Sequence, residues 1–310
     1  MPDLTSRTFA LQATAVAALA IFWALNWPMM KIGLTTVEPW TFRAVVVTAG
    51  GVGCFIVARI IGASIRVPKR ERLPLLWVGL MQGLLWNAFS GFGTAMIEAG
   101  RAAVLAFTMP VWAVILAILF LGEAVTRRRL FGLALGMAGM GLLLLPALEA
   151  LGSSAVGAML MVGGAMSWAV ATTVVKKANF SIHPMVLAGW QFAIGAGPLI
   201  AAAVILGRPS SILEVDGATA SAIIYSALFP MIVCQAIFFT IVKRLPASLA
   251  SMSTLMIPPL GVYFSAAILG ERVGPAEFGA LVLVSAAMVM ILPGFNWRAI
   301  RRPREASRPG

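Results

Sequence analysis

Four residues in one apolar segment could together contact a bulky solute. Trp23, Asn26, Trp27 and Met30 follow one another at i, i+3, i+4 and i+7, a spacing that places them on one face of a helix. This face combines two indole rings, an amide and a thioether, which suits a molecule with an apolar body and a polar head. It suits ordinary packing between helices as well, and the segment alone leaves both uses open.

Asn26 and Pro28 are unusual residues for the middle of such a segment. A buried amide costs free energy unless it is hydrogen-bonded, so Asn26 either bonds a neighbouring helix or faces a wet cavity. Pro28 lacks a backbone donor, which bends a helix or leaves a carbonyl oxygen free as an acceptor. Both readings of each residue stay open.

Rings and polar side chains recur together in other apolar segments, as in Trp86-Asn87 and Trp190-Gln191. Each pair alone fits packing as well as lining, but the repetition predicts a polar, aromatic cavity. Its candidate lining consists of Trp23, Asn26, Trp27, Met30, Gln82, Trp86, Asn87, Thr108, Trp112, Trp168, Thr172, Trp190, Gln191, Gln235, Phe238 and Tyr263.

Residues for catalysis or metal binding are scarce. His183 is the only histidine, it falls in an expected loop, and no metal-ligand or catalytic motif is present. We therefore expect neither an enzyme, nor a metal site, nor a cofactor. No Asp or Glu lies in the middle of an apolar segment, which disfavours proton-driven transport of organic cations.

Two carboxylates and two prolines recur near the ends of apolar segments and are expected to be structural. Glu123 and Glu271 would bond neighbouring helix termini or basic residues, and Pro110 and Pro258 precede them in the same segments.

Lys31 and Arg43 are expected near an outer mouth, with Glu38 as the partner in an ion pair. Because few cations are then left inside the segments, anionic solutes such as phosphorylated sugars are disfavoured. A neutral or zwitterionic solute with a large apolar side chain remains, and an aromatic amino acid is the simplest example.

Composition determines which elements carry these residues. The chain has 310 residues, of which 60% are hydrophobic and 11% charged, far from the balance of soluble proteins. A membrane-spanning helix needs about 20 apolar residues, so the chain is expected to be an all-α polytopic membrane protein. Ten spans are predicted, at 10–35, 39–61, 73–96, 101–121, 128–147, 155–175, 184–206, 218–241, 247–269 and 275–293.

The net charge of +12 comes from short basic clusters between the apolar segments, such as those at 66–72, 127–129 and 298–308. This placement indicates contact with a lipid bilayer and argues against nucleic acid as a partner. Basic residues favour the cytoplasmic side, so both termini are predicted to lie in the cytoplasm of a bacterial inner membrane.

The chain also repeats itself. Gly122-Glu123 aligns with Gly270-Glu271 at an offset of 148, and Trp23 aligns with Trp168 at an offset of 145. We therefore divide the chain into halves, 1–150 and 151–310, the second ending in a basic cytoplasmic tail. Five helices in each half mean that the second enters the membrane inverted, an arrangement typical of transporters.

Ten helices in two inverted repeats, the W-x-x-N motif of Trp23 and Asn26, and the doubled P…LGE ending at Glu123 and Glu271 resemble the EamA-type branch of the drug/metabolite transporter superfamily. The resemblance covers residues 10–295. It implies a basket of helices 1–4 and 6–9 around a central cavity, with helices 5 and 10 outside. The aromatic content of helices 1, 3 and 6 is similar to that of bacterial aromatic-amino-acid exporters.

We accordingly predict a solute transporter that works by alternating access and exports aromatic or other bulky neutral amino acids. Its partner would be that small molecule. The alternatives are an exporter of another small neutral metabolite or drug, such as a nucleoside, and a membrane scaffold without transport. Proton coupling and the choice between a monomer and a homodimer stay open; Gly132-x-x-x-Gly136 favours packing within the chain over a dimer contact.

Overall fold

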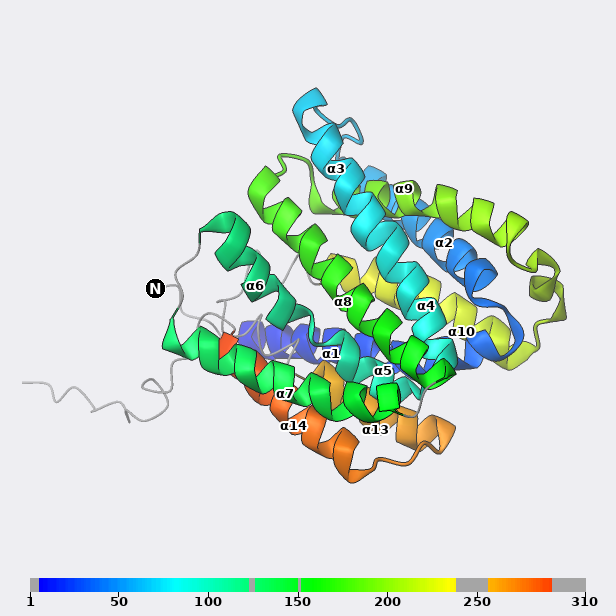
Figure 1. Ribbon diagram of the computed structural model, residues 1–310. Coiled ribbons are helices and arrows are strands. Elements are labelled where there is room, and N and C mark those ends of the chain that lie inside the picture. Colours follow the sequence, from blue (N-terminus) through cyan, green and yellow to red (C-terminus); the bar gives the residue numbers. More distant parts are fainter. Residues whose placement is uncertain (1–5, 123–125, 150–151, 238–255, 292–310) are drawn as a thin grey trace, which may run out of the picture.

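The computed structural model describes residues 6–122, 126–149, 152–237 and 256–291, and throughout them the chain forms helices and loops without a strand. Figure 1 shows the helices packed side by side, with α2 and α9 along one side of the bundle and α7 and α14 along another. Of the predicted site residues, Glu123 and Phe238 lie outside the described residues, as do the start of the ninth predicted span and the C-terminal tail.

The first half contains α1 to α7. In chain order its elements are α1 (Ser6–Thr36), α2 (Pro39–Ile60), η1 (Lys69–Glu71), α3 (Arg72–Val78), η2 (Gly79–Leu85), α4 (Trp86–Met96), α5 (Ala99–Ala106), α6 (Met109–Leu121) and α7 (Arg127–Glu149). The described residues of the second half form α8 (Ser153–Ala178), α9 (Pro184–Ile205), η3 (Pro209–Glu214), α10 (Gly217–Leu228), η4 (Phe229–Val233), α13 (Ile257–Leu269) and α14 (Pro275–Ile291).

Among the described residues, seven helical stretches are long and apolar enough to cross a membrane, and three shorter apolar helices accompany them, at 130–145, 257–269 and 275–290. The prediction of an all-α, multi-pass membrane protein is therefore confirmed. Ten crossings in two inverted repeats stay a prediction.

The predicted span 101–121 corresponds to one candidate span, Ala99–Leu121, but within it the helix is interrupted at Phe107 and Thr108, between α5 and α6. Pro110 explains the break, since a proline has no N–H to bond the carbonyl oxygen four residues earlier, at Ala106. The predicted span 73–96 likewise contains a π-helical turn, η2, between α3 and α4.

Close backbone contact fixes how η2 crosses α9. A Cβ atom on Gly83 would lie 2.0 Å from the carbonyl oxygen of Gln191, and one on Gly195 would lie 2.2 Å from the carbonyl carbon of Gly83. Only glycine at both positions allows this approach. Gly136 packs against a side chain within the chain, because a Cβ there would lie 2.2 Å from Val111 Cγ2.

Candidate solute-binding site

The predicted face of α1 points into the bundle, where α1 packs against α10 and α13. Trp27 and Met30 are buried, and Trp23 and Asn26 are half-buried. The Trp27 ring lies against Gly261 of α13, whose Cβ would be 3.2 Å from Trp27 Cδ1. Trp27 therefore packs between two helices.

Asn26 has an unused acceptor. Its Oδ1 atom is buried and has no hydrogen-bond partner in the described part of the chain. A buried oxygen without a donor destabilises the protein, so this atom is free to receive a donor from a bound molecule.

Arg43, near the start of α2, is buried among neutral groups. Its side chain is only 3% exposed. Nη1 donates to Asn87 Oδ1 (3.3 Å), and Nη2 donates to Ser90 Oγ (2.8 Å) and to Met30 Sδ. Nε is buried without a partner, and in the described ranges no carboxylate contacts the guanidinium.

The expected ion pair between Glu38 and Lys31 or Arg43 is therefore wrong. Glu38 instead caps the N-terminus of α2, because its carboxylate accepts hydrogen bonds from the backbone N–H groups of Trp40 (2.8 Å) and Thr41 (2.6 Å). Two N–H groups at a helix start are unpaired without such a cap. The expectation that the spans hold few buried cations also fails at Arg43.

Lys31 binds the end of another helix. Its Nζ donates to the carbonyl oxygens of Thr94 (2.8 Å), Ala95 (3.1 Å) and Ile97 (2.7 Å), at the C-terminus of α4. A cation is stabilised there, because the last carbonyl groups of a helix lack partners and carry partial negative charge.

The polar partners of Arg43 are themselves held by helix carbonyl groups. Asn87 is fully buried, and its Nδ2 donates to the carbonyl oxygens of Gln82 and Gly83 (3.0 Å each) in the π-helical turn. Ser90 Oγ donates to the carbonyl oxygen of Trp86 (2.6 Å). Both side chains are thus oriented before any solute arrives, with Asn87 Oδ1 and Ser90 Oγ directed at Arg43.

Several other predicted residues are buried in the bundle near these helices. Trp86 of α4 and Trp168 of α8 pack edge to face, with ring centroids 5.0 Å apart. Trp112 Nε1 is buried without a partner among the described residues. Three further polar residues are buried, namely Thr108, Gln191 and Gln235, and Gln82 is half-buried. The hydroxyl of Thr108 donates to the carbonyl oxygen of Leu105.

Three residues of the predicted lining lie away from the Arg43 side chain. Trp190 donates through Nε1 to the carbonyl oxygen of Ile65, beyond the end of α2 opposite to Arg43. Tyr263 is 65% exposed, and Thr172 is exposed with its hydroxyl bonded to the carbonyl oxygen of Trp168. The part of these three residues in a cavity lining stays a prediction.

Two hollows occur elsewhere on the described surface. One, of about 500 Å³, is an apolar groove lined by residues of α2, α9 and η3, and the other is a cleft of about 10 Å³ beside Arg101 and Glu271. Neither contains a residue of the predicted cavity lining, so the central cavity stays a prediction.

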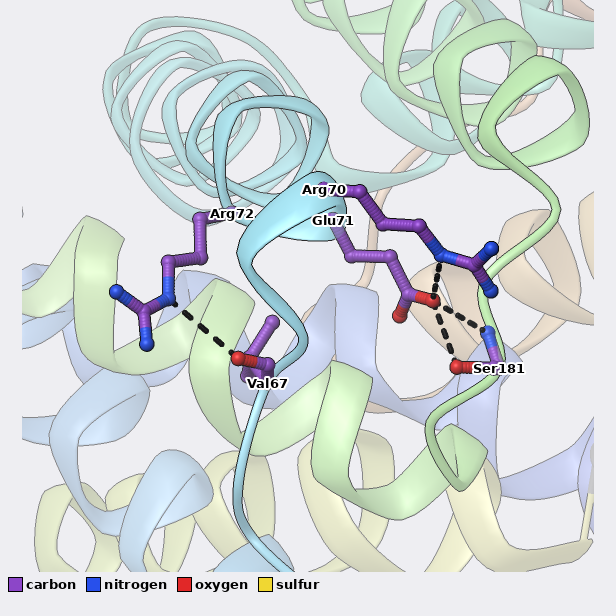
Figure 2. A network of polar contacts seen from close by, with 5 residues as sticks. All are labelled: Val67, Arg70, Glu71, Arg72 and Ser181. Carbon is purple, nitrogen blue, oxygen red and sulfur yellow. Dashed lines mark hydrogen bonds and ion pairs between the residues drawn. The ribbon is translucent and has the colours of Figure 1, made fainter.

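Polar contacts join the two predicted halves at both ends of the bundle. At one end Glu271, just after α13, accepts hydrogen bonds from the N–H groups of Ala99 (2.6 Å) and Gly100 (2.9 Å), and Arg101 pairs with Glu277 of α14. At the other end (Figure 2), buried Glu71 accepts hydrogen bonds from Ser181 Oγ (2.6 Å) and Ser181 N (3.2 Å).

Arg43 and Ser90 were not among the predicted site residues. The signal that could have found Arg43 is its position within the predicted span 39–61, since a cation inside an apolar span indicates function by default. Ser90 could not be singled out, because serines are common inside membrane helices and their partners are on other helices.

A bundle of apolar helices that buries an arginine, amides and indole rings defines a multi-pass membrane protein with a polar interior, a construction typical of transporters. Comparison with known proteins agrees. Residues 11–145 and 155–292 match the EamA-like transporter family. The chain therefore belongs to this family.

Similar proteins include transporters whose names give a probable cargo. The chain is 26% identical to the "Probable amino-acid metabolite efflux pump" of Escherichia coli (strain K12), covering 90% of this chain and 94% of that protein. It is 24% identical to the "Probable terminal-alkyne amino-acid exporter" of Streptantibioticus cattleyicolor, covering 99% of each. A solved structure titled "Crystal structure of protein" has a TM-score of 0.61 at 18% identity, covering 89% of this chain and 96% of that one, and supports the fold.

Proposed function

We propose that this chain exports bulky neutral amino acids, aromatic ones among them, by alternating access across a bacterial inner membrane. The observation that carries the proposal is the open acceptor of Asn26 on a face of α1 shared with Trp23, Trp27 and Met30. Indole rings and a thioether suit an apolar side chain, and the amide oxygen suits an ammonium group. The relatives named as amino-acid exporters support the same cargo class.

Parallel features of the proposed halves, 1–150 and 151–310, support alternating access. The third predicted helix of each half contains a π-helical turn, η2 or η4. Helices α6 and α13 are both 13 residues long, and each ends at a left-handed glycine, Gly122 (φ 65°) or Gly270 (φ 68°). Halves of equal construction in opposite orientation can exchange conformations around a site between them.

The placement of both termini in the cytoplasm follows from the basic clusters of the sequence. This orientation also agrees with the described loops, because successive loops of a multi-pass protein lie on alternate sides of the membrane. The basic η1 segment shares one end of the bundle with Ser181, which belongs to the loop between α8 and α9. In this orientation the contacts of Glu271 close the outer end.

Counterflow into liposomes that contain the purified protein tests the proposal. Liposomes loaded with unlabelled L-phenylalanine should accumulate labelled L-phenylalanine and L-tryptophan saturably, and empty liposomes should not. A labelled nucleoside and a quaternary ammonium drug serve as comparison cargoes. Saturable uptake of either of these without any amino-acid uptake would overturn the proposal, and a nucleoside result would favour the metabolite alternative. An imposed pH gradient in the same assay decides proton coupling.

A further inference from the structure

We propose that Arg43 binds the carboxylate of the transported solute and thereby restricts the cargo to molecules with one carboxylate and an apolar body. This inference rests on the proposed amino-acid export for the identity of the solute. It adds the group that the site recognises and the residue that recognises it.

The first argument is the unbalanced charge. A buried cation is stable only when it is paired or fully hydrogen-bonded. A guanidinium offers five N–H donors, whereas the described partners of Arg43 are an amide oxygen, a hydroxyl and a thioether sulfur, all neutral, and Nε has no partner. Thioether sulfur is a weak acceptor. A carboxylate would replace it with a charged acceptor of matching planar geometry.

The second argument is the surrounding charge. Lys31 follows Met30 in α1, and its ammonium group lies on the last carbonyl groups of α4, the helix that also supplies Asn87 and Ser90 to Arg43. Glu38, the expected counter-ion, is occupied at the N-terminus of α2. Glu271 and Glu98 lie close enough to Lys31 to balance its charge, so among the described residues Arg43 is the buried cation left without a counter-ion, and it attracts an anion.

The third argument is spacing. Asn26 and Met30 are four residues apart in α1, about 6 Å along the helix axis, and Met30 Sδ contacts the Arg43 guanidinium. A zwitterionic amino acid can bridge these two side chains, with its carboxylate bound to Arg43 and its ammonium group donating to Asn26 Oδ1, which has no other partner among the described residues. The indole rings of Trp23 and Trp27 share that face of α1. An organic cation without a carboxylate would instead be repelled.

A structural role for Arg43, as a clamp between α1, α2 and α4, makes a different prediction. A clamp affects folding without changing which solutes compete. A carboxylate site changes the ranking of solutes, and that ranking can be measured in the unaltered protein.

The test is competition against labelled L-phenylalanine in counterflow. Competitors are 3-phenylpropionate, which keeps the carboxylate and lacks the amine, and L-phenylalaninamide, which keeps the amine and lacks the carboxylate. We expect the propionate to compete at least about tenfold more strongly than the amide, as for one charged contact. Equal competition, or stronger competition by the amide, would overturn the inference while leaving amino-acid transport standing.

Substitution then assigns the effect to Arg43. Arg43→Met should weaken competition by 3-phenylpropionate about tenfold or more and should not weaken competition by L-phenylalaninamide, because the charge that repels its ammonium group is gone. Arg59→Met is the matched control, because Arg59 is exposed at the opposite end of the same helix, and it should behave as the unaltered protein. If Arg43→Met does not fold, Gly91→Ala replaces it, since a Cβ there would lie 3.0 Å from Arg43 Cγ and 3.1 Å from Nε and so displace the side chain. Unchanged ranking in the folded variant would overturn the inference.

A binding readout separates this inference from the proposed function. If the protein exchanges no amino acid, thermal stabilisation by 3-phenylpropionate is measured in detergent instead. Stabilisation of the unaltered protein but not of Arg43→Met would support the carboxylate site. Equal stabilisation of both, or of neither, would overturn it.

Discussion

The Oε2 atom of Glu271 lies 2.9 Å from the backbone nitrogen of Gly100, although 171 residues separate them along the chain. Together with the hydrogen bond from Ala99 N to Oε1, this contact caps the N-terminus of α5 with a carboxylate from the far half of the chain. The first N–H groups of a helix lack partners and carry partial positive charge. The contact therefore stabilises α5 and also joins the two proposed halves at one end of the bundle.

Replacing Glu271 by Gln should destabilise the protein by about 1–2 kcal/mol, because the amide has one acceptor oxygen for two N–H groups and no charge. The free energy of unfolding, measured by titration with denaturing detergent, checks this. Glu214→Gln is the control, since Glu214 pairs with Arg208 on the exposed surface and should change stability by less than about 1 kcal/mol. Equal effects of the two substitutions would contradict the assigned cap.

The opposite end of the bundle depends on Glu71 and Ser181 (Figure 2). Glu71 is buried, and its carboxylate accepts from both the hydroxyl and the N–H of Ser181. A double-mutant cycle of Glu71→Gln and Ser181→Ala should give a coupling free energy of about 1–3 kcal/mol, as for a hydrogen bond to a charged group. Additive effects would mean that the contact contributes no stability.

The helix positions could be predicted because each boundary has a local cause. Glu38-Pro39 marks the start of α2 through a capping side chain and a proline in the first turn, and Gly270 ends α13 through a left-handed conformation that glycine adopts easily. The π-helical turn η2 could not be predicted, because one extra residue in a turn leaves no mark on an apolar pattern.

The candidate site could be predicted only in part. Asn26 and Met30 share a face because helix spacing alone determines it. Arg43 was assigned to an outer mouth, since sequence proximity suggested Glu38 as its partner. Two of its actual partners, Asn87 and Ser90, lie more than 40 residues away, and such contacts depend on how helices pack rather than on any local pattern.

The stability of α10 should depend on pH through Asp216. The pKa of this carboxyl is lowered, mainly because it accepts a hydrogen bond from the backbone N–H of Thr219. A lowered pKa means that the unfolded chain binds a proton more readily, so the contribution is complete above the unfolded pKa, about 3.9, and is lost as the pH falls through the folded pKa below it.

Melting temperatures of the unaltered protein and of Asp216→Asn, measured between pH 6 and pH 3, check this. The difference between them should shrink as the pH falls below about 4. A difference that stays constant across this range would show that ionised Asp216 does not cap α10.

Asn26→Ala separates solute binding from packing. Removing a buried oxygen that lacks a partner should leave stability unchanged or slightly raised. The concentration of L-phenylalanine that half-saturates counterflow should nevertheless rise about tenfold, as expected for one lost charged hydrogen bond. Thr35→Ala, at an exposed position of the same helix, should leave both quantities unchanged. Lost stability with unaltered transport would assign Asn26 to interhelical packing.

Counterflow of labelled L-phenylalanine through the unaltered protein tests most directly whether the Asn26 face and Arg43 serve an amino-acid transporter. We predict saturable uptake into loaded liposomes that contain the protein, inhibited by unlabelled L-tryptophan and absent from liposomes without protein. Uptake of phenylalanine and tryptophan no faster than into protein-free liposomes, from a preparation that is folded and monodisperse, would contradict amino-acid export.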